Sequence, residues 1–446
     1  MSVTFTPSLP PFLPQPMLLA YLAPQQRHFL THLAQKIAPF GWHLYLVGGG
    51  VRDLWLAQKQ NQVITLSDLD LVLDQAPPEA LHQIVPLIQT LRPGALVQPH
   101  PKFYTCDLRW PDLALDIALA RTETYPHPTA NPIVTPADIY RDLYRRDFTV
   151  NAMALGLHPQ GEFLDPLGGE QDLQRQYLRV LHPHSFRDDP TRLWRGVRYG
   201  VRYGFTFAPQ TREQWQNTLS SGIYEFWRKQ PGQAPALQTR LRAELVYLWQ
   251  TSRWVRAGRW LEELGAWACI HPDLHWHSEL ERSLRRLSYG NPQEPRRSQC
   301  LTELLLSYLP PPERAKVANL LDIPLNGQKR LAQLASFELK LPQMTSLTVS
   351  QICQKLDLYD RELLYGVMVR HRGQVQQILG NYLYHWSQQR PPLNGDDLRR
   401  LGYPPGPQFR RILARLRSAF LDREITNRAE AMNYLEQHFP RASPGQ

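Results

Sequence analysis

The stretch Gly48-Gly49-Gly50-Val51-Arg52-Asp53, followed by Ser67-Asp68-Leu69-Asp70, decides the fold of the first part of this 446-residue chain. The glycine run follows an apolar segment, which predicts a strand, a tight turn and a helix. Backbone amides at such a turn, together with Arg52, can bind a triphosphate. Asp68 and Asp70 alternate with leucines, so we expect both carboxylates on one face of the next strand. The two motifs together predict a Mg²⁺ site beside a nucleotide, and therefore nucleotidyl transfer.

The glycine stretch also nearly fits the pattern GxGxxG of a dinucleotide-binding dehydrogenase. Asp53 stands where that pattern requires its third glycine, and a ribose needs one carboxylate where this strand offers two. A solvated strand face is the other interpretation of Asp68 and Asp70. Two-metal phosphoryl transfer calls for a third acid, and Asp116 on a neighbouring strand is the candidate, with an ordinary strand-edge acid as its alternative.

Hydrophobic periodicity places these motifs in an α+β head that precedes a helical remainder. The pattern predicts helices over 17–40, 51–59 and 78–91, and strands over 42–47, 64–73, 95–98, 103–110 and 113–121. Short apolar runs over 148–155 and 162–164 end this region, and helical spacing dominates after about residue 170. Eight of the twelve tryptophans lie between residues 194 and 276, where we expect core packing more than stacking on RNA bases.

The charge of the chain favours a polyanionic partner. The net charge is +10, and residues 141–260 hold 18 Lys and Arg against 11 Asp and Glu. The four cysteines are scattered, which is typical of reduced thiols in a cytosolic protein and argues against structural zinc. No segment is long and apolar enough for a membrane span, and the proline-rich start predicts a flexible leader. We expect a cytoplasmic protein.

Two arginine motifs follow the carboxylates. Arg145-Arg146-Asp147 precedes an apolar run, which predicts a strand that would direct Arg146 toward a triphosphate. A structural salt-bridge corner is the alternative. Asp188-Asp189-Pro190 opens a helix, along which Arg192, Arg195, Arg198 and Arg202 recur every three or four residues. That spacing predicts a basic stripe, with a solvated charged face as the alternative.

In this order the motifs resemble the class II tRNA nucleotidyltransferase (CCA-adding enzyme) and bacterial poly(A) polymerase family. The resemblance covers roughly residues 44–200, and Arg240-Leu241-Arg242-Ala243-Glu244-Leu245 fits a further element that we interpret as structural. It implies that the nucleotide is bound by Gly49 and Arg52, the metals by Asp68 and Asp70, the triphosphate by Arg146, and the base by Asp189 and Arg192 with support from Arg195 and Arg198.

The resemblance implies a head with a mixed β-sheet, followed by an all-α neck, body and tail. The segments would be an N-terminal extension over 1–40, the catalytic head over 41–168, the neck over 169–265, the body over 266–345 and a tRNA-binding tail over 346–446. The implied reaction is addition of CMP, AMP or both, from CTP and ATP, to the 3′ end of tRNA with Mg²⁺. A specialist that adds only CC or only A, a poly(A) polymerase and a non-catalytic RNA-binding protein are the alternatives.

Overall fold

The computed structural model describes residues 16–157, 161–230, 232–288 and 295–440, so the expected leader over residues 1–15 lies outside the described residues. The chain forms two compact units, residues 1–244 with 256–269, and residues 245–255 with 270–446. The finer division into five segments stays a prediction. Within the described ranges, no helix is long and apolar enough to cross a membrane.

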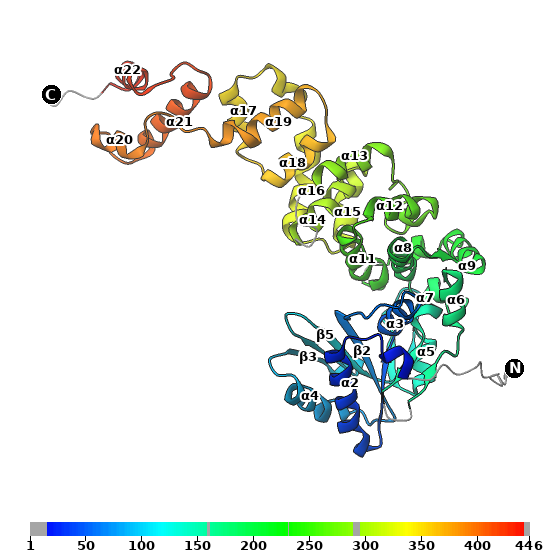
Figure 1. Ribbon diagram of the computed structural model, residues 1–446. Helices are drawn as coiled ribbons and strands as arrows, with labels where there is room; N and C mark the ends of the chain where they lie inside the picture. The colour runs from blue at the N-terminus through cyan, green and yellow to red at the C-terminus, as the bar shows by residue number, and fades with distance from the viewer. Residues whose placement is uncertain (1–15, 158–160, 231, 289–294, 441–446) are drawn as a thin grey trace. The chain divides into compact units, whose positions relative to one another are not determined.

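A seven-stranded mixed sheet in the order β3-β4-β5-β2-β1-β8-β9 forms the centre of the first unit (Figure 1). Its strands are β1 (His43–Val47), β2 (Asp68–Asp74), β3 (Leu96–His100), β4 (Thr105–Arg109), β5 (Ala114–Leu119), β8 (Ala154–Gly156) and β9 (Phe163–Leu164). Strand β2 pairs antiparallel with β1 and parallel with β5. The sheet is therefore not the parallel sheet of a dinucleotide-binding dehydrogenase, and it confirms the expected α+β head.

The rest of the first unit contains two small sheets and several helices, the last two of which also have residues in the second unit. The strand pairs are β6 (Arg121–Thr124) with β7 (Ile133–Pro136), and β10 (Tyr177–Leu178) with β11 (Thr206–Phe207). The helices are α1 (Pro16–Leu19), α2 (Pro24–Ile37), α3 (Gly49–Lys59), α4 (Ala80–Leu91), α5 (Ile139–Tyr144), α6 (Gly169–Arg175), α7 (Ser185–Asp188), α8 (Thr191–Tyr203), α9 (Pro209–Ser220), α10 (Ile223–Arg228), α11 (Thr239–Gln250) and α12 (Trp254–Glu263).

The alternation along β2 divides its side chains between two environments. Leu69, Leu71 and Leu73 are buried, and Val72 on the opposite face joins a hydrophobic cluster with Ile139 of α5. Strand β2 starts at Asp68, four residues later than expected, because Ile64 pairs with Leu22 ahead of α2. The acid pair thus lies at the very start of the strand, where the β-sheet meets the preceding loop.

The strand expected over residues 148–155 is only partly correct. Residues Thr149–Asn151 form a 3₁₀ turn, and β8 begins at Ala154. Backbone hydrogen bonds from Asn151 to Phe148 and from Ala152 to Thr149 close this turn, and the Thr149 side chain donates to the carboxylate of Asp172 at 2.7 Å. Arg146 is therefore held by the turn after α5 and not by a strand.

Helix α8 packs closely against its neighbours. Phe148 and Phe207 lie where a side chain at Gly196 would stand, and the Trp260 ring covers Gly200 in the same way. Six of the eight tryptophans between residues 194 and 276 are buried, as expected of core residues: Trp194, Trp215, Trp249, Trp254, Trp267 and Trp276. The glycines let α8 lie against aromatic rings, which fixes the position of its arginines.

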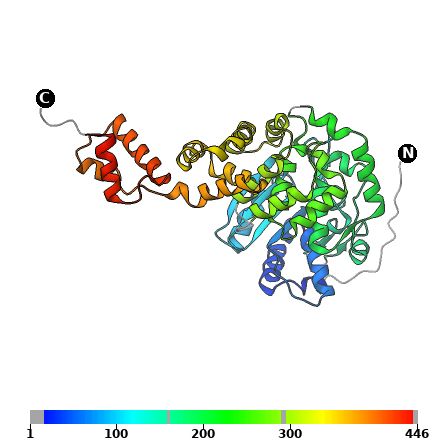
Figure 2. The same ribbon diagram turned by 90° about the horizontal axis from the view of Figure 1, so that it is seen from above.

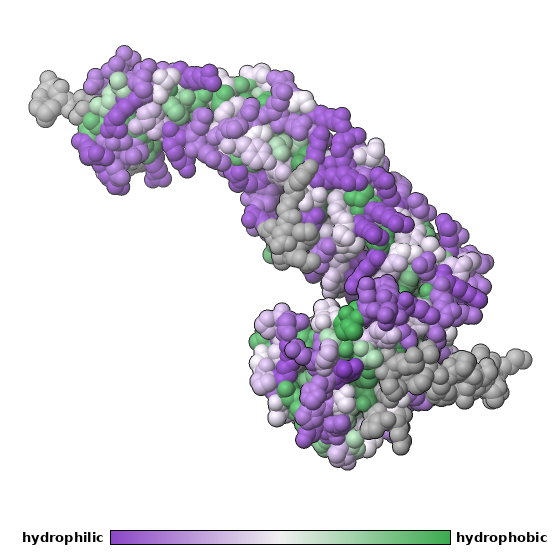
Figure 3. Space-filling view, viewed as in Figure 1, coloured by the Kyte–Doolittle hydropathy of each residue, from purple (hydrophilic) through white to green (hydrophobic). Residues whose placement is uncertain are grey.

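The described part of the second unit is helical and contains no strand. Its helices are α13 (Ser278–Leu287), α14 (Pro295–Leu306), α15 (Pro311–Leu320), α16 (Leu325–Glu338), α17 (Val349–Leu356), α18 (Arg361–Arg370), α19 (Gln374–Tyr384), α20 (Gly395–Arg400), α21 (Pro407–Leu421) and α22 (Arg428–His438). Figures 1 and 2 show α20, α21 and α22 as one group, whose core contains Leu398, Ile412, Leu416 and Leu435. The face of this group visible in Figure 3 is mostly hydrophilic.

Gly200→Ala should destabilise the first unit, because the added methyl would overlap the Trp260 ring and come 2.8 Å from the Phe205 carbonyl oxygen. We expect a loss of about 1–3 kcal/mol in the free energy of unfolding, measured by urea denaturation. Gly366→Ala in α18 is the control, since nothing lies within 4 Å of the added methyl. An equal loss in both variants would contradict close packing at Gly200.

Candidate functional site

A cavity of about 1010 Å³ opens in the first unit. Eight residues that the sequence marked as functional line it: Gly49, Arg52, Asp68, Asp70, Arg146, Asp189, Arg192 and Arg195. Asp116 and Arg198 are not among the lining residues. The fold thus brings the glycine turn, the carboxylates and both arginine motifs to one cavity.

The glycine turn lies directly against Asp70 and Arg146. Gly48 has φ = 67°, and a Cβ atom there would lie 2.9 Å from Nη1 of Arg146 and 3.5 Å from Oδ2 of Asp70. Helix α3 starts at the next residue without a side-chain cap. Uncapped N–H groups at a helix start attract anions, so turn and arginine together suit phosphate oxygens.

The surroundings of Asp70 balance the charge of its carboxylate only in part. Burial raises its pKa, the charges of Asp116 and Asp68 raise it further, and Arg146 opposes them. No described residue donates a hydrogen bond to this carboxylate. A half-buried carboxylate that is repelled by neighbouring acids, next to the exposed Asp68, fits a divalent cation. Since no three His, Cys, Asp or Glu side chains of the described residues form a metal cluster, phosphate or water would complete the coordination.

Asp116 lies beside Asp70 in the sheet, but its carboxylate is paired with an arginine. The two residues are directly paired across β2 and β5, so they share one face of the sheet. In the structure Arg109 forms an ion pair with the Asp116 carboxylate, and the Asp116 side chain is 48% exposed. Its role as a third metal ligand stays a prediction.

Arg52 is buried by partners from three segments. Its guanidinium donates to Asp53 at 2.8 Å, to Asn151 at 2.7 Å and to the Tyr203 hydroxyl at 2.7 Å. The cation also lies over the rings of Tyr203 and Tyr199, with 4.5 and 5.2 Å to the centroids. Arg52 is only 4% exposed. Three of its five N–H groups already donate hydrogen bonds to other protein groups.

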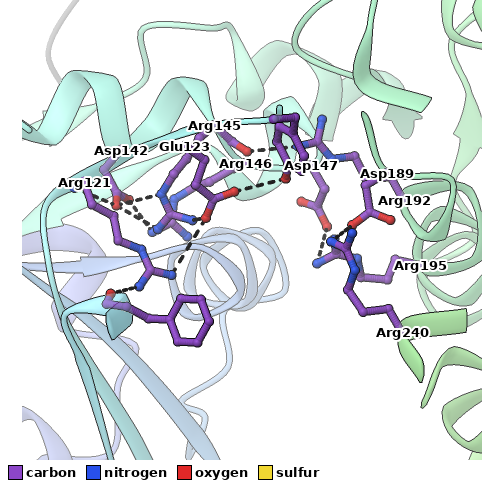
Figure 4. Close-up of polar contacts among 12 residues, drawn as sticks. Arg121, Glu123, Asp142, Arg145, Arg146, Asp147, Asp189, Arg192, Arg195 and Arg240 are labelled. Atoms are coloured by element: carbon purple, nitrogen blue, oxygen red, sulfur yellow. Dashed lines mark hydrogen bonds and ion pairs between the residues drawn. The ribbon is translucent and has the colours of Figure 1, made fainter. Parts of the chain in front are cut away.

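Asp142 links the two arginines of the second motif (Figure 4). Its fully buried carboxylate accepts hydrogen bonds from Arg145 and Arg146, each at 2.8 Å. Arg145 also donates to Glu123 at 2.9 Å. Burial alone would raise the pKa of Asp142, but the two arginines outweigh it and hold the pKa below its usual value. The salt-bridge corner and the lining of the cavity are therefore one structure.

The side chains of Asp189 and Arg192 are both held by protein groups (Figure 4). Oδ1 of Asp189 accepts from the Thr191 amide at 2.9 Å, and Oδ2 accepts from Arg240 at 2.9 Å. Arg192, at 3% exposure, donates to the Arg145 carbonyl and to His182 Nε2, each at 3.2 Å. Arg240 thus supports the predicted base-recognition pair, as its structural interpretation implied.

Arg195 and Arg198 of α8 are not part of a solvated stripe, although Arg202 on the same helix is exposed. Arg195 lies 3.6 Å from the Asp147 carboxylate, and Arg198 lies 3.2 Å from that of Glu244. Burial would lower the pKa of Arg195, but Asp147 and Asp189 outweigh it and raise the pKa. The solvated-face alternative is wrong for these positions, because acids from two other segments pack against the helix.

Sequence reasoning missed four residues of this network: Asp142, Tyr199, Tyr203 and His182. Asp142 had a detectable signal, since it precedes Arg145 and Arg146 by three and four residues, the spacing at which side chains meet along a helix and its last turn. Tyr199 and Tyr203 are also spaced by four residues. His182 gave no such signal, because its partner Arg192 lies in another element.

Several known proteins are similar to this chain. A family model described as "Poly A polymerase head domain" matches residues 44–179. The A-adding tRNA nucleotidyltransferase of Halalkalibacterium halodurans is 30% identical over 424 residues, 93% of each chain. The CC-adding tRNA nucleotidyltransferase of Deinococcus radiodurans is 37% identical over 204 residues, 45% of this chain and 51% of that relative. The fold is similar to the Thermotoga maritima CCA-adding enzyme complexed with tRNA, with a TM-score of 0.70 at 23% identity over 96% of this chain and 99% of that one.

Asp142→Asn should destabilise the protein by about 3–5 kcal/mol at pH 7, because two buried arginines lose their shared anion. The lowered pKa of Asp142 means that its stabilisation is complete above the unfolded pKa of about 4 and is lost as pH falls through the folded pKa. Urea unfolding between pH 3 and pH 7 measures both effects. The exposed Asp112→Asn is the control and should change little; equal losses in the two variants would contradict the prediction.

Proposed function

Because the chain belongs to the class II CCA-adding and A-adding tRNA nucleotidyltransferase family, with a poly A polymerase head domain, we propose that it adds AMP from ATP to tRNA that ends in CC. The observation that carries this choice is the extent of the match. The similarity to the A-adding relative spans 93% of this chain, whereas that to the CC-adding relative spans 45%. The second unit is thus matched by an A-adding protein.

Addition of CC is the second candidate. Over the shorter matched stretch, the CC-adding relative is 37% identical, more than the 30% of the A-adding relative over the whole chain. Addition of the complete CCA would combine both activities.

Asp70 and Asp68 would bind Mg²⁺, which supplies charge stabilisation for the attacking 3′ hydroxyl and the departing pyrophosphate. The fit rests on the half-buried carboxylate of Asp70 beside Gly48, to which no described residue donates a hydrogen bond. The start of α3 and Arg146 would bind the triphosphate oxygens, and Arg52 would hold the turn in place for them. The family generally uses divalent metals. We also propose that this protein acts in the cytoplasm.

Asp189 and Arg192 would select the base. Adenine offers an amine donor beside a ring-nitrogen acceptor, so a carboxylate and a guanidinium can pair with it. Cytosine has the same order of groups, and guanine and uracil have the reverse. Oδ2 of Asp189 accepts one hydrogen bond, from Arg240, which leaves a lone pair for the exocyclic amine. Arg192 keeps three N–H groups beyond those bound to Arg145 and His182.

The nucleotide that is added can be determined with three tRNA transcripts, ending before the first C, after CC and after CCA. We expect labelled AMP on the CC-ending transcript alone and no CMP on any of them. CMP on the transcript without CC would overturn A-addition in favour of CC- or CCA-addition. Repeated AMP addition to an unrelated RNA would instead identify a poly(A) polymerase.

Asp70→Asn and Asp68→Asn should each reduce nucleotide incorporation by roughly 10³-fold or more, because the cation loses a charged ligand. Asp116→Asn should reduce it less, since Arg109 already pairs with that carboxylate. Single-turnover incorporation measures the effect, and filter binding should show unchanged tRNA affinity in all three variants. Near-normal incorporation by Asp70→Asn would contradict the metal role. An equally large loss in Asp116→Asn would make it a third ligand.

A further inference from the structure

Arg192 stands between two cavities of the first unit. Beside the nucleotide cavity lies a second one of about 620 Å³. Arg192 and Arg145 line both, whereas His182 and His184 line only the second. The guanidinium of Arg192 therefore borders open space on the side of the second cavity as well. Its orientation depends on the groups that form hydrogen bonds with it on that side.

His182 is one of two groups that bind this guanidinium. Nε2 of His182 accepts a hydrogen bond from Nη1 of Arg192 at 3.2 Å, and the Arg145 carbonyl accepts one from Nη2 at 3.2 Å. Burial and the charge of Arg192 lower the pKa of His182 to about 4. The imidazole is thus neutral near pH 7, and with the proton on Nδ1 its Nε2 is a permanent acceptor.

The geometry points to His182 as a positioning residue for base selection: by accepting from Nη1 of Arg192 on the side of the second cavity, it fixes the guanidinium plane whose remaining N–H groups would meet the base. This role rests on the proposed selection of the base by Arg192. His182 does not line the nucleotide cavity and so acts only through Arg192. Guanine is rejected when the donors of Arg192 meet its own donor at a fixed place, and a guanidinium free to turn away loses that discrimination.

The test compares three variants. His182→Phe keeps a ring and removes the acceptor, His182→Gln restores an acceptor oxygen, and His184→Ala changes the same cavity at a residue that makes no hydrogen bond to Arg192. For each, kcat/KM is measured for ATP, GTP and UTP on the tRNA that the wild type extends. If the wild type adds CMP, CTP takes the place of ATP.

We expect His182→Phe to lower the preference for ATP over GTP by about 10- to 100-fold, the effect of one hydrogen bond to a charged group. His182→Gln should recover most of it, and His184→Ala should match the wild type. Wild-type selectivity in His182→Phe would overturn the proposal, as would an equal loss in His184→Ala. Should His182→Phe not fold, His182→Met replaces it, since Met has the length of Gln without the acceptor.

Arg192→Ala separates this proposal from the function on which it rests. If Arg192→Ala keeps full selectivity, the base is recognised elsewhere and both proposals fail. If Arg192→Ala loses selectivity while His182→Phe retains it, only the role of His182 is wrong. In the double variant, His182→Phe should add no further loss to Arg192→Ala. An additive loss would show that His182 acts by another route.

Discussion

The site depends on the hydrogen bonds that the buried guanidinium of Arg52 donates. Asn151 and Tyr203, which bind it, lie 99 and 151 residues further along the chain. Burial would lower the pKa of Arg52, but Asp53 and the two tyrosines outweigh it and raise the pKa. A buried cation that lost these partners would cost several kcal/mol. The glycine turn, the 3₁₀ turn and helix α8 are therefore fixed relative to one another.

The same principle of compensated charge governs the rest of the cavity. Asp142, Asp147 and Asp189 are all buried, and arginines hold the pKa of each below its usual value. Most arginine charge in the site is thus balanced inside the protein before any nucleotide binds. The N–H groups that stay available to a ligand belong to guanidinium groups whose orientation the protein already fixes. Such groups need little reorganisation when a triphosphate and a base arrive.

Asp70 is the exception to this compensation. The described arginines near it do not hydrogen-bond its carboxylate, burial raises its pKa, and two further acids add to the repulsion. A half-buried carboxylate whose charge nearby arginines balance only in part gains most from a divalent cation. Asp70 therefore differs from Asp142, Asp147 and Asp189, whose charges are balanced by arginines within the protein.

The sequence by itself determined the head fold and eight residues of the cavity lining. The glycine turn and the alternation of Asp68 and Asp70 are local patterns, since a φ of 67° and a strand period depend on neighbouring residues. Contacts between separate elements were decided only by tertiary structure. The pairing of Asp116 with Arg109, the burial of Arg52 by Tyr203 and the support of Arg192 by His182 are of this kind. No local pattern encodes them, because they depend on how strands and helices pack.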